Sequence, residues 1–239
     1  MMRIAIVIGH NVSQPGAVRV TDGISEFVWN GALAATIQSL APENVRVFRR
    51  ERAGGYNAEV RAVYAQVDAW GADVSCELHF NGAADARATG TETLYASDRG
   101  KVFAERVNRA MVGALGLRDR GVKKVARTDR GGESLYVGRA PAILVEPYFG
   151  SNANDCNAAD VKRDALARAI LAGLLGAAVS APVAPTKPSD LTIEQRLAEL
   201  EMWRAPVEGR GATGARSGGG GGGGAGWGEA GGRTGRRAT

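Results

Sequence analysis

Two uninterrupted runs of aliphatic residues constrain the fold of this chain more than any other feature of its sequence. Ile4-Ala5-Ile6-Val7-Ile8 and Ala142-Ile143-Leu144-Val145 contain no polar residue. Runs of this length without alternation are typical of strands that are covered on both faces, as in parallel sheets between helices. They predict an α/β domain.

The segments between the two runs alternate between strand and helix patterns. Five strands are predicted, at residues 3–8, 45–48, 74–80, 91–95 and 142–146. Apolar residues recur at helical spacing from about Ile24 to Leu40, from Asn57 (the expected N-cap) to Val67, from Phe103 to Ala114, and through Leu166, Ile170 and Leu174. This order predicts a single mixed, mostly parallel sheet flanked by helices on both faces, within a domain of residues 1–180.

The composition changes after residue 180. Three prolines predict an extended linker over residues 181–190, and apolar residues at helical spacing predict a short amphipathic helix over residues 191–203. Residues 204–239 hold 15 of the chain's 34 glycines, and we expect this segment to be disordered.

Charge and composition exclude several classes of protein. Six arginines against two glutamates give residues 204–239 a net charge of +4, out of +5 for the whole chain, so the folded domain is not expected to bind nucleic acid. No stretch approaches the roughly 20 apolar residues of a membrane helix, and the first apolar run is too short for a signal peptide. Cys76 and Cys156 are too few for a disulfide framework, and we expect two buried free thiols.

The chain contains only two histidines, and both lie at the ends of predicted strands, His10 after the first and His79 after the third. In open α/β sheets, binding sites form at the carboxyl ends of strands, so this pair favours a metal site. A catalytic zinc ion takes about three protein ligands, which makes the third ligand a carboxylate. Glu26 is the first candidate because it falls at the start of a predicted helix. Glu77 shares a strand face with His79 and is the second candidate, and Asp22 is the third.

Glu146 ends the second aliphatic run. A carboxylate at the end of a buried strand is costly unless it has a partner such as a metal ion or a cation. Hydrolysis of an amide needs a base for the attacking water and an acid for the leaving nitrogen, and Glu146 is the candidate for both roles.

Together these residues resemble the signature of zinc-dependent N-acetylmuramoyl-L-alanine amidases. The matching segments span about residues 3–176 in the family's order and comprise His10 with Pro15-Gly16-Ala17, Glu26, Leu78-His79-Phe80-Asn81-Gly82-Ala83, Arg120-Gly121-Val122-Lys123 and Ile143-Leu144-Val145-Glu146-Pro147-Tyr148-Phe149-Gly150-Ser151-Asn152. The resemblance implies that His10, Glu26 and His79 bind one zinc ion per chain and that Glu146 is the catalytic glutamate. It also implies hydrolysis of the amide bond between N-acetylmuramoyl and L-alanine in peptidoglycan.

Three features depart from the family's usual pattern. Asn11-Val12 replaces the two glycines that usually follow the first histidine, and Glu77 stands where a serine is common. Family members that act outside the cytoplasm usually carry a signal peptide, and none is expected here. The third departure points to an endolysin of phage or gene-transfer-agent type, made in the cytoplasm and released to the cell wall by a holin.

Polar residues outside the four main positions are candidates for substrate contacts. Arg120 and Lys123 could hold the free carboxylates of stem peptides, and Arg139, near the last strand, is a candidate on the same terms. Asn81, two residues after His79, is a further candidate. Two alternative functions remain at this stage: a zinc carboxypeptidase or endopeptidase that acts on stem peptides, and an inactive cell-wall-binding module with the same fold.

Overall fold

The computed structural model describes residues 1–177. The predicted linker at 181–190, the helix at 191–203 and the segment 204–239 lie outside the described residues, as does the end of the predicted domain.

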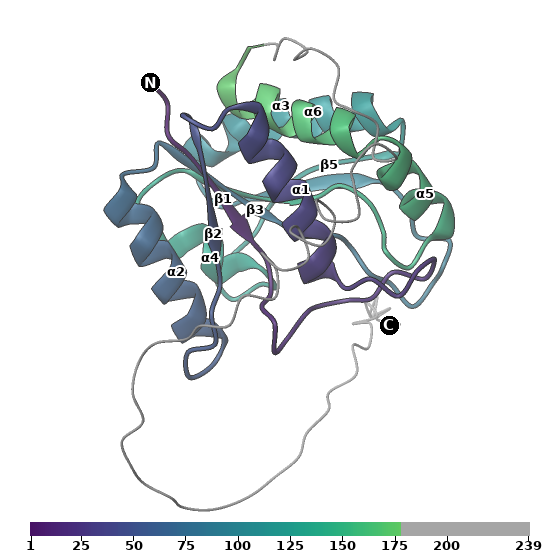
Figure 1. The fold of residues 1–239 in the computed structure, drawn as a ribbon, viewed down its shortest axis with the longest axis horizontal. Helices are drawn as coiled ribbons and strands as arrows, with labels where there is room; N and C mark the ends of the chain where they lie inside the picture. Colours follow the sequence, from purple (N-terminus) through teal and green to yellow (C-terminus); the bar gives the residue numbers. More distant parts are fainter. Residues whose placement is uncertain (178–239) are drawn as a thin grey trace, which may run out of the picture. The chain divides into compact units, whose positions relative to one another are not determined.

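A single six-stranded sheet forms the centre of the described domain (Figure 1). Its strands are β1 (Ile4–Ile8), β2 (Val45–Arg49), β3 (Val74–Leu78), β4 (Thr91–Tyr95), β5 (Asp119–Lys124) and β6 (Ala142–Glu146). Their order across the sheet is β2-β1-β3-β6-β4-β5. All neighbouring pairs are parallel except β4 and β6, which are antiparallel, so the predicted mixed, mostly parallel sheet is confirmed.

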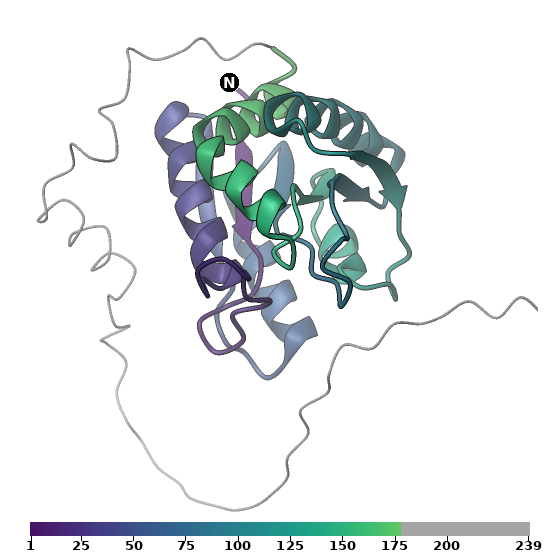
Figure 2. The same ribbon diagram turned by 90° about the vertical axis from the view of Figure 1, so that its right-hand side faces the viewer.

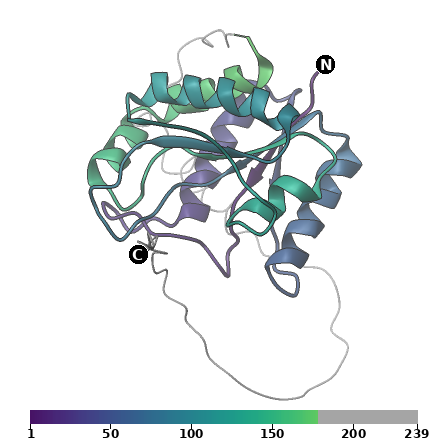
Figure 3. The same cartoon turned by 180° about the vertical axis from the view of Figure 1, so that it is seen from behind.

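Helices cover both faces of the sheet. They are α1 (Glu26–Leu40), α2 (Tyr56–Trp70), α3 (Asp98–Leu115), α4 (Gly132–Val137), α5 (Ala153–Val161) and α6 (Arg163–Leu175). Helices α1, α6 and α3 pack side by side on one face (Figure 2). Helices α2 and α4 pack together on the other face, which is nearer the viewer when the molecule is seen from behind (Figure 3). None of the helices in residues 1–177 is long and apolar enough to cross a membrane.

The two aliphatic runs form central strands, as predicted. All five residues of β1 are buried, and so are the four aliphatic residues of β6. Helix α1 begins at Glu26, and the Ser25 side chain caps it by accepting a hydrogen bond from the Val28 amide. Helix α2 begins earlier than predicted, at Tyr56 after Gly55, so Asn57 lies inside the helix and the N-cap prediction is wrong.

The strand order positions the site. Strands β1, β3 and β6 are parallel neighbours, so their carboxyl ends meet at one edge of the sheet. Because β4 runs antiparallel to β6, its first residues lie at the same edge, with Glu92 opposite Glu146. Residues that follow β1, β3 and β6 and residues that begin β4 are therefore brought together.

Candidate active site

His10, Glu26 and His79 converge at this edge, and each offers one ligand atom within 4.8 Å of the others. Nδ1 of His79 lies 2.7 Å from Oε1 of Glu26, and Nε2 of His10 lies 3.2 Å from Oε2 of the same carboxylate. The two imidazole rings meet edge to face with centroids 5.0 Å apart. The side chain of Glu26 is buried, whereas each histidine keeps a small part of its ring exposed, so the cluster is open to solvent on one side.

Backbone amides also hold the Glu26 carboxylate. The Phe80 amide donates to Oε1 at 3.1 Å, and the Ala17 amide donates to Oε2 at 3.2 Å. Burial would raise the pKa of Glu26, but the hydrogen bonds from His10 and His79 hold it well below its usual range. This side chain is therefore an anion at neutral pH.

The turn after β1 brings the first histidine to the cluster. His10 has a φ of 67°, in the left-handed region that non-glycine residues rarely adopt. Gly16 has a φ of 83° and lies so close that a Cβ atom there would be 2.7 Å from Cδ2 of His10 and 2.8 Å from Oε2 of Glu26. The close approach of this loop to the cluster requires glycine at position 16.

Glu77 contacts the other ring nitrogen of His79 and does not belong to the group of His10, Glu26 and His79. Its Oε1 atom is 3.0 Å from Nε2 of His79, and its Oε2 atom accepts a hydrogen bond of 3.2 Å from the Tyr64 hydroxyl. Burial would lower the pKa of His79, but its hydrogen bonds to Glu26 and Glu77 raise that pKa to about 10. Burial would raise the pKa of Glu77, but the bond to His79 and the nearby positive charges lower it to about 2.

Glu146 is the last residue of β6 and lies beside the segment that carries His79. The His79 amide donates to the carbonyl of Val145, the residue before Glu146, at 3.1 Å. The Oε2 atom of Glu146 is buried and has no hydrogen-bond partner within the described residues. Burial is the main cause that raises the pKa of Glu146 to about 8. The charge of His79 lowers this pKa in part, and the charges of Glu26 and Glu92 raise it. A carboxyl group with a pKa near neutrality and a free oxygen is suited to proton transfer.

Three of the candidate substrate residues gather on one carboxylate that the sequence analysis missed. Asn81, Arg120 and Lys123 donate to Glu92 at 2.9, 2.5 and 2.6 Å. The Arg120 guanidinium also stacks over the Phe149 ring at 4.9 Å. The antiparallel pairing of β4 with β6 sets this position, and no local sequence signal indicates which strand lies opposite β6.

Arg139 and Asp22 lie outside the cluster. Arg139 precedes β6, its amide donates to Oδ1 of Asp68 in α2, and it therefore lies at the opposite end of β6 from Glu146. Asp22 accepts from the Ile24 amide and pairs with Arg19 at 3.3 Å. Both cysteines are buried and free, as expected.

Comparisons with known proteins identify the family of this chain. A family model described as N-acetylmuramoyl-L-alanine amidase matches residues 4–175. The chain therefore belongs to the N-acetylmuramoyl-L-alanine amidase family, hydrolases that act on peptidoglycan. A search of curated protein sequences finds no match to this chain.

Solved structures share the fold at low sequence identity. The catalytic domain of the CD27L endolysin, which targets Clostridia difficile, has a TM-score of 0.66 and 24% identity, and the alignment covers 75% of this chain and 100% of that one. The catalytic domain of CwlV, an N-acetylmuramoyl-L-alanine amidase from Bacillus (Paenibacillus) polymyxa var. colistinus, has a TM-score of 0.63 and 23% identity over 73% and 97% of the two chains. The amidase AmiC2 of Nostoc punctiforme has a TM-score of 0.61 and 22% identity over 73% and 96%.

Proposed function

We propose that His10, Glu26 and His79 bind one zinc ion and that Glu146 transfers protons while the amide bond between N-acetylmuramoyl and L-alanine is hydrolysed. The observation that carries this proposal is the convergence of two imidazoles and one carboxylate, from three separate segments, with ligand atoms within 4.8 Å. Many catalytic zinc sites have two nitrogen donors and one oxygen donor from the protein and leave one coordination position open to solvent.

The charges around the cluster favour a bound cation. Glu26, Glu77 and Glu146 surround the two histidines, and Glu26 and Glu77 both have lowered pKa values. Nδ1 of His79 lies 2.7 Å from the Glu26 carboxylate and Nε2 lies 3.0 Å from the Glu77 carboxylate. Because a neutral imidazole has a single N–H, the two contacts together require a positive charge on the ring or between the ring and one carboxylate. A divalent cation bound by His79 and Glu26 would supply that charge, and Nε2 of His79 would then keep its proton for Glu77.

The side chains divide the chemistry between them. When bound, the zinc ion polarises the scissile carbonyl and increases the acidity of the attacking water. The carboxylate of Glu146 accepts the proton of that water on Oε2, which has no competing donor among the described residues. The same atom then returns the proton to the amino group of L-alanine as it leaves.

Arg120, Lys123 and Asn81 are proposed to contact the stem peptide. Glu92 holds all three at the edge of the sheet that carries Glu146, and the side chains of Arg120 and Lys123 remain partly exposed. These two partly exposed cationic side chains are proposed to bind a free carboxylate of the peptide. Arg139 is left out of this proposal because it lies at the other end of β6.

We further propose that the chain acts as an endolysin, which reaches the cell wall from the cytoplasm when the membrane is permeabilised. The likeness to the catalytic domain of an endolysin supports this proposal. Cells that express the chain should keep their turbidity until the inner membrane is permeabilised and should then lyse, whereas cells that express Glu146→Gln should not. Lysis without permeabilisation would contradict the proposal.

The reaction is tested by mass spectrometry of digested peptidoglycan, before and after removal of metal with a chelator. We expect stem peptides with a free L-alanine amino group, no product after chelation, and recovery when zinc is added back. Release of a D-amino acid would indicate a carboxypeptidase, and the absence of any product would indicate a binding module. Full turnover in the chelated protein would exclude the zinc proposal.

A further inference from the structure

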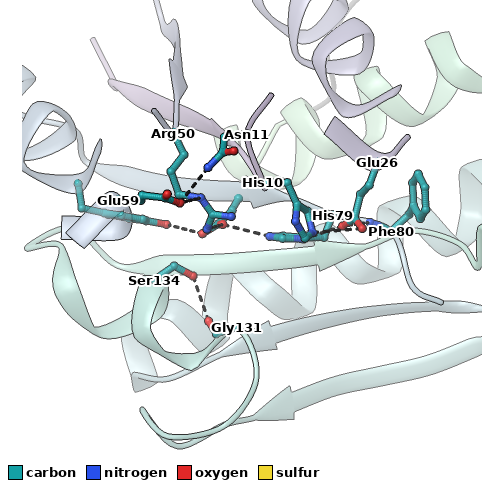
Figure 4. A network of polar contacts seen from close by, with 11 residues as sticks. His10, Asn11, Glu26, Arg50, Glu59, His79, Phe80, Gly131 and Ser134 are labelled. Atoms are coloured by element: carbon teal, nitrogen blue, oxygen red, sulfur yellow. Dashed lines mark hydrogen bonds and ion pairs between the residues drawn. The ribbon is translucent and has the colours of Figure 1, made fainter. Parts of the chain in front are cut away.

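A chain of buried polar side chains leads away from His79 (Figure 4). It begins at Glu77, whose two oxygens contact the His79 ring and the Tyr64 hydroxyl. Nη1 of Arg50 lies 3.9 Å from Oε1 of Glu77, and Nε of Arg50 lies 3.7 Å from Oε2 of Glu59. Arg50, Glu59 and Glu77 are each at most 4% exposed, so this is a row of buried charges and not a surface ion pair.

The other end of the row reaches the turn that carries His10. Nδ2 of Asn11 donates to Oε2 of Glu59 at 2.9 Å. The Asn11 Oδ1 atom accepts from the amides of Ser13 and Gln14, each at 2.9 Å, so its side chain also shapes the turn. Both histidines of the cluster are thus connected to the same buried arginine, His79 through Glu77, and His10 through its neighbour Asn11 and Glu59.

Stability alone does not account for such a network. Burying charged groups carries a desolvation cost that their attraction often fails to offset, and apolar residues of similar volume are commonly as stable. The best-supported use of buried charges is to specify one arrangement among several. The groups specified here are the ring of His79 and the backbone after His10, which has the unusual φ of 67°.

We propose that Glu77, Arg50, Glu59 and Asn11 form one positioning network that sets the orientation of the His79 ring and its separation from His10. Glu77 fixes the ring so that Nδ1 faces Glu26, and Arg50 and Glu59 extend the restraint to Asn11. Two of the three positions that depart from the family's usual pattern, Asn11 and Glu77, are the two ends of this network. The inference rests on the proposed metal site.

Two conservative variants test the network. Glu77→Gln keeps the size of the side chain but removes its charge, and Asn11→Asp keeps the acceptor for the turn but replaces the donor that faces Glu59. A matched control is Glu133→Gln, because Glu133 is also a buried carboxylate between arginines, at 3.6 Å from Arg61 and 3.5 Å from Arg127. Circular dichroism and thermal melting select the folded variants.

The measurements are the Kd for zinc alone, by competition with a chelator, and the visible spectrum of the cobalt-loaded protein, which reports ligand geometry. Loss of an outer partner of a metal-binding histidine costs about 10–100-fold in affinity. We expect that weakening for Glu77→Gln, a smaller one in the same direction for Asn11→Asp, altered cobalt bands in both, and no change in Glu133→Gln.

An unchanged zinc Kd and cobalt spectrum in either folded variant would overturn the network, and so would an equal change in Glu133→Gln. These outcomes are distinct from failure of the proposed function. A wild-type chain that binds no zinc contradicts the metal site itself, whereas a zinc-loaded wild type with indifferent variants contradicts only the network.

Discussion

Glu146 is the residue at which proton transfer and metal binding can be separated by experiment. The glutamine variant is isosteric, so Glu146→Gln should keep the fold and nearly all of the zinc. Turnover should fall by roughly 10²–10⁴-fold, which is the usual effect of losing a positioned proton-transfer group. Because the loss lies in the transition state, KM should change little in steady-state assays on soluble muropeptides.

The pH profile of the wild type provides the control for this prediction. A general base must be ionised, so activity should fall as the pH drops below the pKa of Glu146, which is about 8 without metal. A bound cation favours the carboxylate and moves this acidic limb to lower pH. Glu146→Gln should lack the limb. Loss of zinc in this variant, or near-normal turnover, would contradict the assigned role.

At the scale of elements, the loop between β1 and α1 makes the closest approach to the cluster. Gly16→Ala should weaken zinc binding at least tenfold, because the added Cβ would collide with His10 and Glu26. Gly23→Ala is a matched control, since Gly23 also has a positive φ, of 72°, but no atom within 4 Å of the added Cβ. Both variants should lose stability in thermal melts because of the positive φ, Gly16→Ala should lose more because of the collisions, and only Gly16→Ala should lose metal. Equal zinc affinities of the two variants would show that the loop moves enough to accommodate the added methyl group.

The pairing of β4 with β6 makes a separate prediction for Glu92. Burial would raise the pKa of Glu92, but the hydrogen bonds from Lys123, Arg120 and Asn81 lower it below its usual 4.5. A lowered pKa in the folded state contributes stability above the unfolded value, and this contribution is lost as the pH falls through the folded value.

Glu92→Gln should therefore lower the urea midpoint at pH 7, and the difference from the wild type should shrink progressively below about pH 4.5. Its KM for stem-peptide substrates should rise, because Arg120 and Lys123 lose their anchor. A difference in urea midpoint that persists at low pH would mean that packing, and not charge, accounts for the effect.

Elements with a strong apolar pattern were predictable, and those without one were not. Strands β1 and β6 are central and aliphatic, so their sequences identify them. Strand β5 reads Asp-Arg-Gly-Val-Lys-Lys and lies at the sheet edge with its residues half-buried or exposed, and it is not among the predicted strands. Helices α4 and α5 were missed because each is short, with six and nine residues.

The residues of the candidate site also differ in how far the sequence alone could identify them. His10 and His79 could be identified because the chain has only two histidines and both follow strands. Glu26 was one of three open carboxylates on residue reasoning alone, and only the fold brings it to the histidines. Glu92 and Arg50 could not be predicted, because their contacts depend on pairing between strands that are distant in the sequence.

At the scale of the whole molecule, all the proposed chemistry lies between His10 and Glu146, and the family match ends at residue 175. A chain truncated after Ala181 should therefore fold, bind zinc and cleave soluble muropeptides at the rate of the full chain. Circular dichroism, zinc analysis and a muropeptide assay check this. Complete unfolding of the truncated protein would show that residues beyond 181 belong to the core.

The most direct test of the central claim, a zinc ion held by His10, Glu26 and His79, is the zinc content of purified protein by elemental analysis. We predict about one zinc per chain in the wild type and in Glu146→Gln. His79→Ala should hold almost none, because an incomplete set of ligands binds zinc weakly. A folded His79→Ala variant that retains one zinc per chain and normal turnover would contradict the metal site.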